Sequence, residues 1–308
     1  MATLQTLRRQ VEGAEDLHSI VRAMKSISAV RIRQFRVAVE SLEDYARTLE
    51  LGFHASLRGR TRIPLPRPAP EAPAVAVVFG ADQGLAGQFN TRVLELAEEA
   101  AADSAAREVH LFAVGARLAE RLAARRSRVA ERFPAAGSID EVGGVVRDLL
   151  VTCRRWREER GVERFTLFYN DYRGGASYEP VRVELLPLEA GWLQRLREEP
   201  WPGPSLPAYR IEWPALFELL VREHLFVTLY RACAESGAAE NASRLSAMEA
   251  AESRIEERLG RLEDRLNRQR QQAITEELLE VVSGFQALEE EGDEEGGEVR
   301  RHPGEARG

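Results

Sequence analysis

The 308-residue sequence is poor in several residue types, and each shortage narrows the possible functions. Its two cysteines, Cys153 and Cys233, are isolated and its five histidines are scattered, which predicts a reducing compartment and no metal site. Aromatic residues make up only 7% of the chain, which suits long helices better than a large sandwich core. No window of about 18 apolar residues occurs, and no charged segment followed by an apolar run opens the chain. We therefore expect a protein that is neither secreted nor membrane-spanning.

Lysine is almost absent, because Lys25 is the only one among 43 basic residues. The formal net charge of −7 is spread unevenly. Residues 1–62 carry eleven bases against seven acids, whereas residues 289–308 carry eight acids against three arginines. A mildly basic start and an acidic tail predict contacts with other proteins. With 44% apolar and 30% charged residues, the chain has the balance of a soluble protein of one or two domains.

Proline is missing from the whole stretch between Pro214 and Leu288. One uninterrupted helix of this length would extend about 110 Å, which no compact core could hold. Apolar residues within the stretch recur in a heptad pattern, with Glu252 and Gln269 as polar interruptions, and this predicts a coiled-coil seam. The seam residues are Leu245, Met248, Ile255, Leu259, Leu262, Leu266 and Ala273.

The other end of the chain holds a comparable stretch, a predicted helix from Thr3 to about Leu57. Its heptad frame is interrupted at Ser28 and Arg31, and its members are Leu17, Val21, Met24, Phe35, Ala38, Leu42, Tyr45 and Leu49. We therefore predict that the two ends wrap around each other and that everything between them is an insert. A basic cluster of Arg22, Lys25, Arg31 and Arg33 lies among small residues in this helix; it fits a contact surface and a solvated face equally well.

The insert alternates strands and helices, which predicts a small, Rossmann-like α/β domain with a mainly parallel sheet. A proline-rich linker, 58–73, precedes it, and residues 187–207 form an irregular return followed by a possible short strand at 209–213. The predicted strands are 74–79, 109–114, 164–172 and 178–186, and the predicted helices end near 102, 126 and 160.

A glycine-rich loop, 80–90, joins the first strand of the insert to its helix. Gly80, Gly84 and Gly87 fit neither the dinucleotide-binding fingerprint nor the P-loop, so a structural role is favoured over phosphate binding. Asp82 in this loop is predicted to be a cap and not a base. No Ser/His/Asp, Cys/His or paired-carboxylate grouping occurs, so we expect no catalytic residue and no cofactor.

Three stretches carry a family resemblance. The first is Ala23-Met24-Lys25 with Arg31-Ile-Arg33, and the second is Gly84-Leu-Ala-Gly87 with Phe89-Asn90. The third lies in the last helix and comprises Leu229-Tyr-Arg231, Glu240, Arg244, Ala247-Met248, Asn267, Arg270-Gln271, Ile274-Thr275, Glu277-Leu278 and Glu280-Val-Val-Ser-Gly284. Over residues 1–288, the sequence resembles the gamma subunit of rotary F-type ATP synthases.

The resemblance implies an antiparallel coiled coil of the N- and C-terminal helices with the α/β domain as a foot. The divisions are then 1–57, first helix; 58–73, linker; 74–208, foot; 209–288, last helix; and 289–308, an acidic tail expected to be disordered. It also implies a non-catalytic shaft that couples ion flow through the membrane c-ring to ATP synthesis or hydrolysis in the alpha/beta head. The implied partners are the alpha, beta and epsilon subunits and the c-ring, at the cytoplasmic face of the bacterial cell membrane, without nucleic acid.

By the same resemblance, coupling contacts to partner subunits fall on both helices. They are Met24, Lys25, Arg31, Arg33, Arg244, Arg270, Gln271, Thr275, Glu277, Val282 and Phe285. In the first helix, His18, Ser26, Ser28, Phe35 and the stretch 42–50 are closer to the divergent N-type branch, for which sodium translocation is one candidate. Membership of that branch stays open here, and so does the coupling ion.

Two other readings compete with the shaft. A nucleic-acid-binding protein could use a basic coiled-coil arm, but the first helix is only weakly basic and has acids interleaved. A small α/β nucleotide-binding enzyme could carry a coiled-coil stalk, and this reading predicts a ligand that stabilises the insert.

Overall fold

The computed structural model describes residues 4–60, 63, 68–125, 127–205 and 207–297, with side chains described as far as Gly284. It divides into two compact units. The larger unit comprises residues 22–250, and the smaller unit combines residues 1–21 with residues 251–308. The smaller unit therefore combines the two ends of the chain, and the larger unit is the continuous segment between them.

A five-stranded sheet forms the middle of the larger unit, with the strand order β3-β2-β1-β4-β5. Its strands are β1 (Ala74–Phe79), β2 (Val109–Val114), β3 (Val129–Phe133), β4 (Arg164–Gly174) and β5 (Ser177–Leu186). All pairings are parallel except that of β4 with β5, which confirms the mainly parallel sheet. Every residue of β1 is buried, as expected of a central strand with both faces covered.

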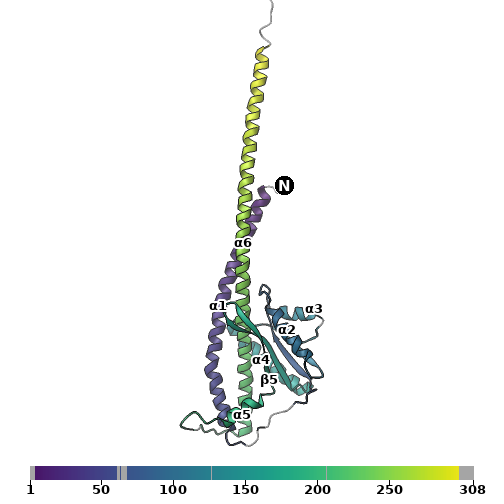
Figure 1. Cartoon of the computed structure of the whole chain (residues 1–308), viewed down its shortest axis with the longest axis vertical. Coiled ribbons are helices and arrows are strands. Elements are labelled where there is room, and N and C mark those ends of the chain that lie inside the picture. Colours follow the sequence, from purple (N-terminus) through teal and green to yellow (C-terminus); the bar gives the residue numbers. More distant parts are fainter. Residues whose placement is uncertain (1–3, 61–62, 64–67, 126, 206, 298–308) are drawn as a thin grey trace, which may run out of the picture. The chain divides into compact units, whose positions relative to one another are not determined.

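Helices cover the two faces of the sheet (Figure 1). Alternate residues of β1 belong to two different cores, which shows which helices lie on each face. Ala76 and Val78 belong to the core beneath α2 (Phe89–Ala102) and α3 (Ala116–Ala124). Val75 and Val77 belong to the opposite core, which includes α4 (Ile139–Arg160) and part of the last helix. The α/β insert is thus packed directly against the last helix of the chain.

Two long helices complete the fold: α1 (Leu4–Leu57) and α6 (Trp213–Gly297). Within the larger unit, the Tyr45 hydroxyl donates a 2.9 Å hydrogen bond to Glu223, whereas Phe35 lies against Gly237. Residue numbers fall along one helix as they rise along the other, so α1 and α6 are antiparallel. In the smaller unit, Leu7 and Ala14 of α1 pack in one cluster with Leu262 of α6. The predicted fold class, an antiparallel pair of terminal helices with an α/β insert, is confirmed.

The seam of α6 follows the predicted frame as far as Gln269, but the seam of α1 is partly displaced. Leu17 and Tyr45 were predicted to lie in the seam, yet they are 56% and 47% exposed. One seam position is as predicted, and its members are Leu7, Ala14, Val21, Ser28, Phe35, Leu42 and Leu49. The second lies one residue later than predicted and comprises Val11, His18, Lys25, Ile32, Val39, Ala46 and Phe53. Seam residues of a heptad are spaced alternately by three and four residues, and the order of the two spacings can be mistaken. Apolar residues beside the seam of α1 therefore gave a predicted second position that lies one residue too early.

Four further expectations need correction. Strand β3 was not predicted, because its short sequence contains Glu131 and Arg132 and most of it is only partly buried. Helix α5 (Ala190–Glu198) lies in the return predicted to be irregular, and it packs Leu193 in the same cluster as Leu57. No strand forms over 209–212, where Ile211 is exposed. Helix α6 continues nine residues past Leu288, where disorder was expected; residues 298–308 lie outside the described chain.

No helix among the described residues is long and apolar enough to cross a membrane.

Candidate coupling surface

The glycine loop after β1 is built for close packing. A Cβ on Gly80 would lie 2.6 Å from the Cβ atom of Leu118 and 2.7 Å from Oδ1 of Asn90. That Asn90 oxygen accepts a 2.9 Å hydrogen bond from the backbone N–H of Ala81. Farther along the loop, the Ser243 hydroxyl of α6 donates a 2.7 Å hydrogen bond to the Ala86 carbonyl. These contacts support the structural role predicted for the loop and fasten it to the last helix.

Asp82 acts as the predicted cap. Its Oδ1 atom accepts a 2.6 Å hydrogen bond from the N–H of Ala116, the first residue of α3. Its Oδ2 atom accepts a 3.1 Å hydrogen bond from the N–H of Ala135, just after β3. One carboxylate therefore joins the loop after β1 to the segments that follow β2 and β3, and it satisfies a donor at a helix N-terminus.

A cleft of about 310 Å³ lies beside the glycine loop, between that loop and α3. Two arginines line it, and both are engaged within the chain. Arg117 pairs with Glu120 at 2.7 Å, and Arg121 donates a 2.6 Å hydrogen bond to the Thr91 hydroxyl. The cleft therefore offers no arrangement that favours nucleotide chemistry over the structural role of the loop.

A buried polar layer lies on α6 beneath the insert. Arg244 and Glu240 pair at 2.6 Å, with side chains only 5% and 13% exposed. Burial raises the pKa of Glu240, and the adjacent Arg244 opposes that rise. Arg244 was predicted to contact a partner subunit, but its guanidinium is enclosed within this chain. One turn before this pair, burial raises the pKa of Glu235 to about 6, against the opposing effect of a hydrogen bond from Tyr169.

The predicted contact residues of α1 lie on the surface of the larger unit. Met24, Lys25 and Arg31 are partly buried, and Arg33 is exposed. Large apolar side chains lie on the same helix and are more than half exposed: Ile27, Val30 and Val37. These three residues were not among the predicted contact residues, although their spacings of three and seven residues place them on one side of a helix. Exposed apolar groups beside basic ones indicate a surface that another molecule covers.

The described end of α6 is exposed on every side. Every described side chain from Gln271 to Gly284 is exposed, and so is Arg270 before them, at the edge of the seam that ends with Gln269. Large apolar side chains recur here with exposures of 50% to 61%: Ile274, Leu278, Leu279, Val281 and Val282. At 3.6 residues per turn they cover more than one face of the helix. The remaining predicted contacts in this stretch, Gln271, Thr275 and Glu277, are also exposed, and the Phe285 side chain lies outside the described part.

Comparison with known proteins identifies the family. A family model described as ATP synthase matches residues 3–288. The ATP synthase gamma chain of Anaeromyxobacter sp. (strain Fw109-5) is 30% identical over 297 residues, covering 94% of this chain and all of that one. The gamma chain of Salinibacter ruber is 30% identical over 313 residues, covering 95% of this chain and all of that one. The chain belongs to the ATP synthase gamma family.

Solved structures agree on the fold. In the Euglena gracilis mitochondrial ATP synthase, a chain of the rotor matches with a TM-score of 0.58 and 17% identity, covering 88% of this chain and 98% of that chain. A chain in the OSCP/F1/c-ring structure of the same enzyme matches with a TM-score of 0.62 and 18% identity, covering 99% of both chains. As a member of the gamma family, the chain is a non-catalytic, central-stalk subunit of F-type ATP synthase, a peripheral part of a membrane-associated complex.

Proposed function

We propose that this chain is the rotor shaft that mechanically couples ion flow through a c-ring to ATP synthesis or hydrolysis in an alpha/beta head. The observation that carries the proposal is the end of α6, where apolar side chains on more than one face are exposed from Ile274 to Val282. A solitary helix with this surface needs an apolar sleeve around it. A ring of alternating alpha and beta subunits supplies such a sleeve.

A shaft must also be attached firmly to the part that receives torque. In the larger unit, Leu229 and Cys233 of α6 are buried in the core that includes β1 and α4. The hydrogen bond from Ser243 to Ala86, at 2.7 Å, also holds α6 to the insert, and the one from Trp213 to Ser56, at 2.7 Å, holds α6 to α1. A rotation applied to the α/β insert would therefore turn α6 with it. We assign this insert, residues 74–208, as the foot that meets epsilon and the c-ring.

The proposed divisions of the chain are a first helix over 1–57, a linker over 58–73, the foot, a last helix over 209–288 and an acidic tail over 289–308. The proposed location is the cytoplasmic face of a bacterial cell membrane. Coupling contacts are assigned to the predicted surface residues other than Arg244: on α1 to Met24, Lys25, Arg31 and Arg33, and on α6 to Arg270, Gln271, Thr275, Glu277, Val282 and Phe285. The N-type assignment rests on the first helix and stays a prediction.

Adding a positive charge beside Lys25 tests the coupling role. In the assembled complex, Met24→Lys places a second ammonium group beside Lys25, in a bearing that moves past acidic groups of the head. We expect ATP hydrolysis to stay within about twofold of the parent, whereas ion pumping per ATP in vesicles falls severalfold, because the added charge disturbs the fit between shaft and head without touching the catalytic sites.

Ala29→Lys is the matched control. Ala29 is exposed on α1, five residues from Met24 and so roughly 140° around the helix from it. This variant adds the same charge on the other side of the seam and should leave pumping per ATP unchanged. Unaltered pumping per ATP in Met24→Lys, with the head assembled normally, would contradict the proposed bearing.

A further inference from the structure

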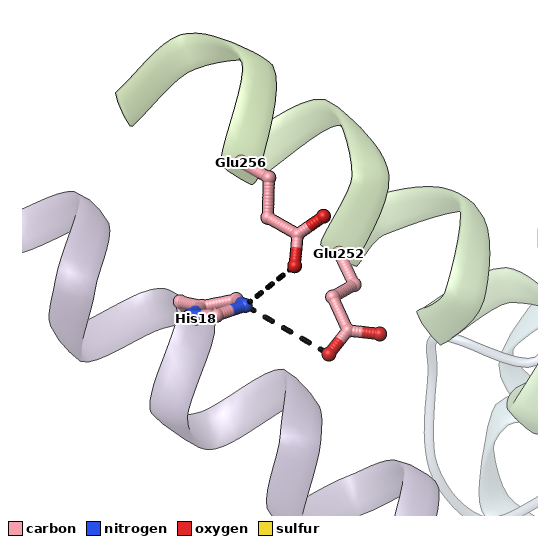
Figure 2. A group of neighbouring side chains, drawn as sticks. All are labelled: His18, Glu252 and Glu256. Atoms are coloured by element: carbon pink, nitrogen blue, oxygen red, sulfur yellow. Dashed lines mark ion pairs between the residues drawn. The ribbon is translucent and has the colours of Figure 1, made fainter. Parts of the chain in front are cut away.

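Three metal-ligating side chains meet within the smaller unit, and they come from opposite ends of the chain. His18 lies on α1, whereas Glu252 and Glu256 lie on α6 one turn apart and so share a face of that helix. Nε2 of His18 lies 3.3 Å from Oε1 of Glu256 and 3.8 Å from Oε1 of Glu252 (Figure 2). One ligand atom from each of the three residues lies within 4.8 Å of the other two.

The position of the trio in the seam makes its chemistry unusual. His18 occupies the second seam position of α1, where the same position two turns earlier holds the apolar Val11. Glu252 is the polar interruption of the α6 seam between Met248 and Ile255. Polar groups at seam positions lower the stability of a coiled coil and are retained where they do something specific. Nε2 of His18 is buried and has no hydrogen-bond partner among the described residues.

Two carboxylates converging on one imidazole nitrogen also concentrate negative charge. The Glu252 side chain is only 17% exposed, so water screens that charge incompletely. A divalent cation between the three groups would offset both carboxylates and give the imidazole nitrogen a partner.

We propose that His18, Glu252 and Glu256 bind a divalent cation of the zinc class, which clamps the start of α1 to α6. Zinc bonds of 2.0–2.2 Å in a tetrahedral arrangement place neighbouring ligand atoms about 3.4 Å apart. The two distances from His18 Nε2, 3.3 and 3.8 Å, already bracket that separation. An imidazole with two carboxylates selects zinc and its transition-metal neighbours over magnesium or calcium, which prefer oxygen ligands alone.

The fourth coordination position faces solvent, because the Glu256 side chain is 59% exposed, and a water molecule completes the shell there. No metal site was predicted from the sequence, because no pair of histidines or cysteines has ligand spacing along the chain. His18 is more than two hundred residues away from the two glutamates in sequence and meets them only through the register of the antiparallel helices. The site is a property of this chain alone and does not depend on the rotor function proposed above.

The test uses the full-length chain without a histidine tag, because a tag would bind the probe. Isothermal titration with Zn²⁺ measures binding, and the visible absorption of the Co²⁺ form reports the coordination geometry. Thermal unfolding measures how far the bound metal stabilises the paired helices. We expect one zinc per chain, a tetrahedral cobalt spectrum, and a rise in Tm with zinc that EDTA reverses. Both His18→Ala and Glu256→Gln should weaken zinc binding at least ~tenfold, by analogy with the 10–100-fold losses that follow even outer-shell changes.

Glu263→Gln is the matched control, because Glu263 occupies the same heptad position as Glu256, two turns farther along α6, and is exposed. It should bind zinc as the parent does. Circular dichroism establishes that each variant keeps its helical content. Zinc binding of equal strength in the parent and in His18→Ala would overturn the proposal. So would a parent Tm that neither zinc nor EDTA alters, since the trio would then be an ion pair only.

Discussion

At the scale of single residues, a glycine of α6 makes room for a buried aromatic ring of α1. A Cβ on Gly237 of α6 would lie 2.7 to 2.9 Å from three ring atoms of Phe35, which is 1% exposed. Phe35 also belongs to the core that includes β1 and α4. One aromatic ring thus ties α1 to α6 and to the insert, and it has no room to withdraw from an added methyl group.

Gly237→Ala is therefore expected to destabilise the larger unit. Alanine would normally gain about 1 kcal/mol over glycine inside a helix. Overpacking a filled core typically costs ~1–3 kcal/mol. Because the Phe35 ring cannot move without disturbing the sheet, we expect this steric cost to exceed the gain in helix propensity. Urea unfolding followed by tryptophan fluorescence measures this unit, because all four tryptophans lie in it.

Gly144→Ala serves as the comparison for that measurement. Gly144 lies in α4 of the same unit, and a Cβ there meets nothing within 4 Å. The substitution should raise stability by ~0.5–1 kcal/mol from helix propensity alone. An equal increase in stability from both substitutions would show that the Phe35 ring shifts easily to accommodate the added methyl group and that its contact with Gly237 is loose.

The role of a residue could be predicted where the local sequence around it indicates that role. It could not be predicted where the role depends on how separate elements pack together. Asp82 lies in the glycine loop that follows a strand, and its capping role was predicted from that context. Arg244 was assigned to a partner contact and no structural role was predicted for His18, because the burial of both side chains depends on how other elements pack against their helices. Arg244 proved to be enclosed with Glu240, and His18 proved to occupy a seam position.

At the scale of elements, the strong periodic segments were predictable and the weak ones were not. Strand β1 is a continuous apolar run, β2 is apolar apart from His110, and α1 and α6 carry long heptads, so the existence of these elements follows from sequence. Strand β3 has charged residues and few fully buried ones, and α5 is bounded by prolines, so neither produces a clear pattern. The α1 frame was displaced because Leu17 and Tyr45 are apolar residues beside the seam.

Asp82 joins three of these elements, and its removal should loosen the edge of the sheet where they end. Asp82→Ala leaves the N–H groups of Ala116 and Ala135 without their acceptor, at an expected cost of about 1–3 kcal/mol. Asp82→Asn keeps one acceptor oxygen and should lose roughly half as much. Asp103→Ala, at the exposed end of α2, controls for the loss of charge. The urea midpoint, measured by tryptophan fluorescence, should fall most in Asp82→Ala, less in Asp82→Asn and least in Asp103→Ala. An unchanged midpoint in Asp82→Ala would show that the cap is redundant.

At the scale of the whole molecule, the family assignment accounts for residues 3–288 and leaves the acidic end of the chain outside it. The seam that holds the start of α1 on α6 extends only to Leu262, Leu266 and Gln269, well before that end. Sequence patterns predicted the paired helices and the insert between them. They did not predict that α6 continues to Gly297, because the acidic residues and glycines of the tail indicated disorder, although no proline lies in the tail before that point.

Removing residues 289–308 should therefore leave the chain able to assemble and couple. Ending the chain at Gly260 instead removes Leu262 and Leu266, which uncovers Leu7 and Val11 on α1. Tryptic cleavage at Arg8 and Arg9 reports this difference, since cleavage of a helix requires local opening. The rate should match the parent in the chain ending at Leu288 and rise severalfold in the chain ending at Gly260. Co-purification with an ATP-hydrolysing head completes the measurement, and exclusion of the chain ending at Leu288 from the complex would show that the acidic segment is needed for assembly.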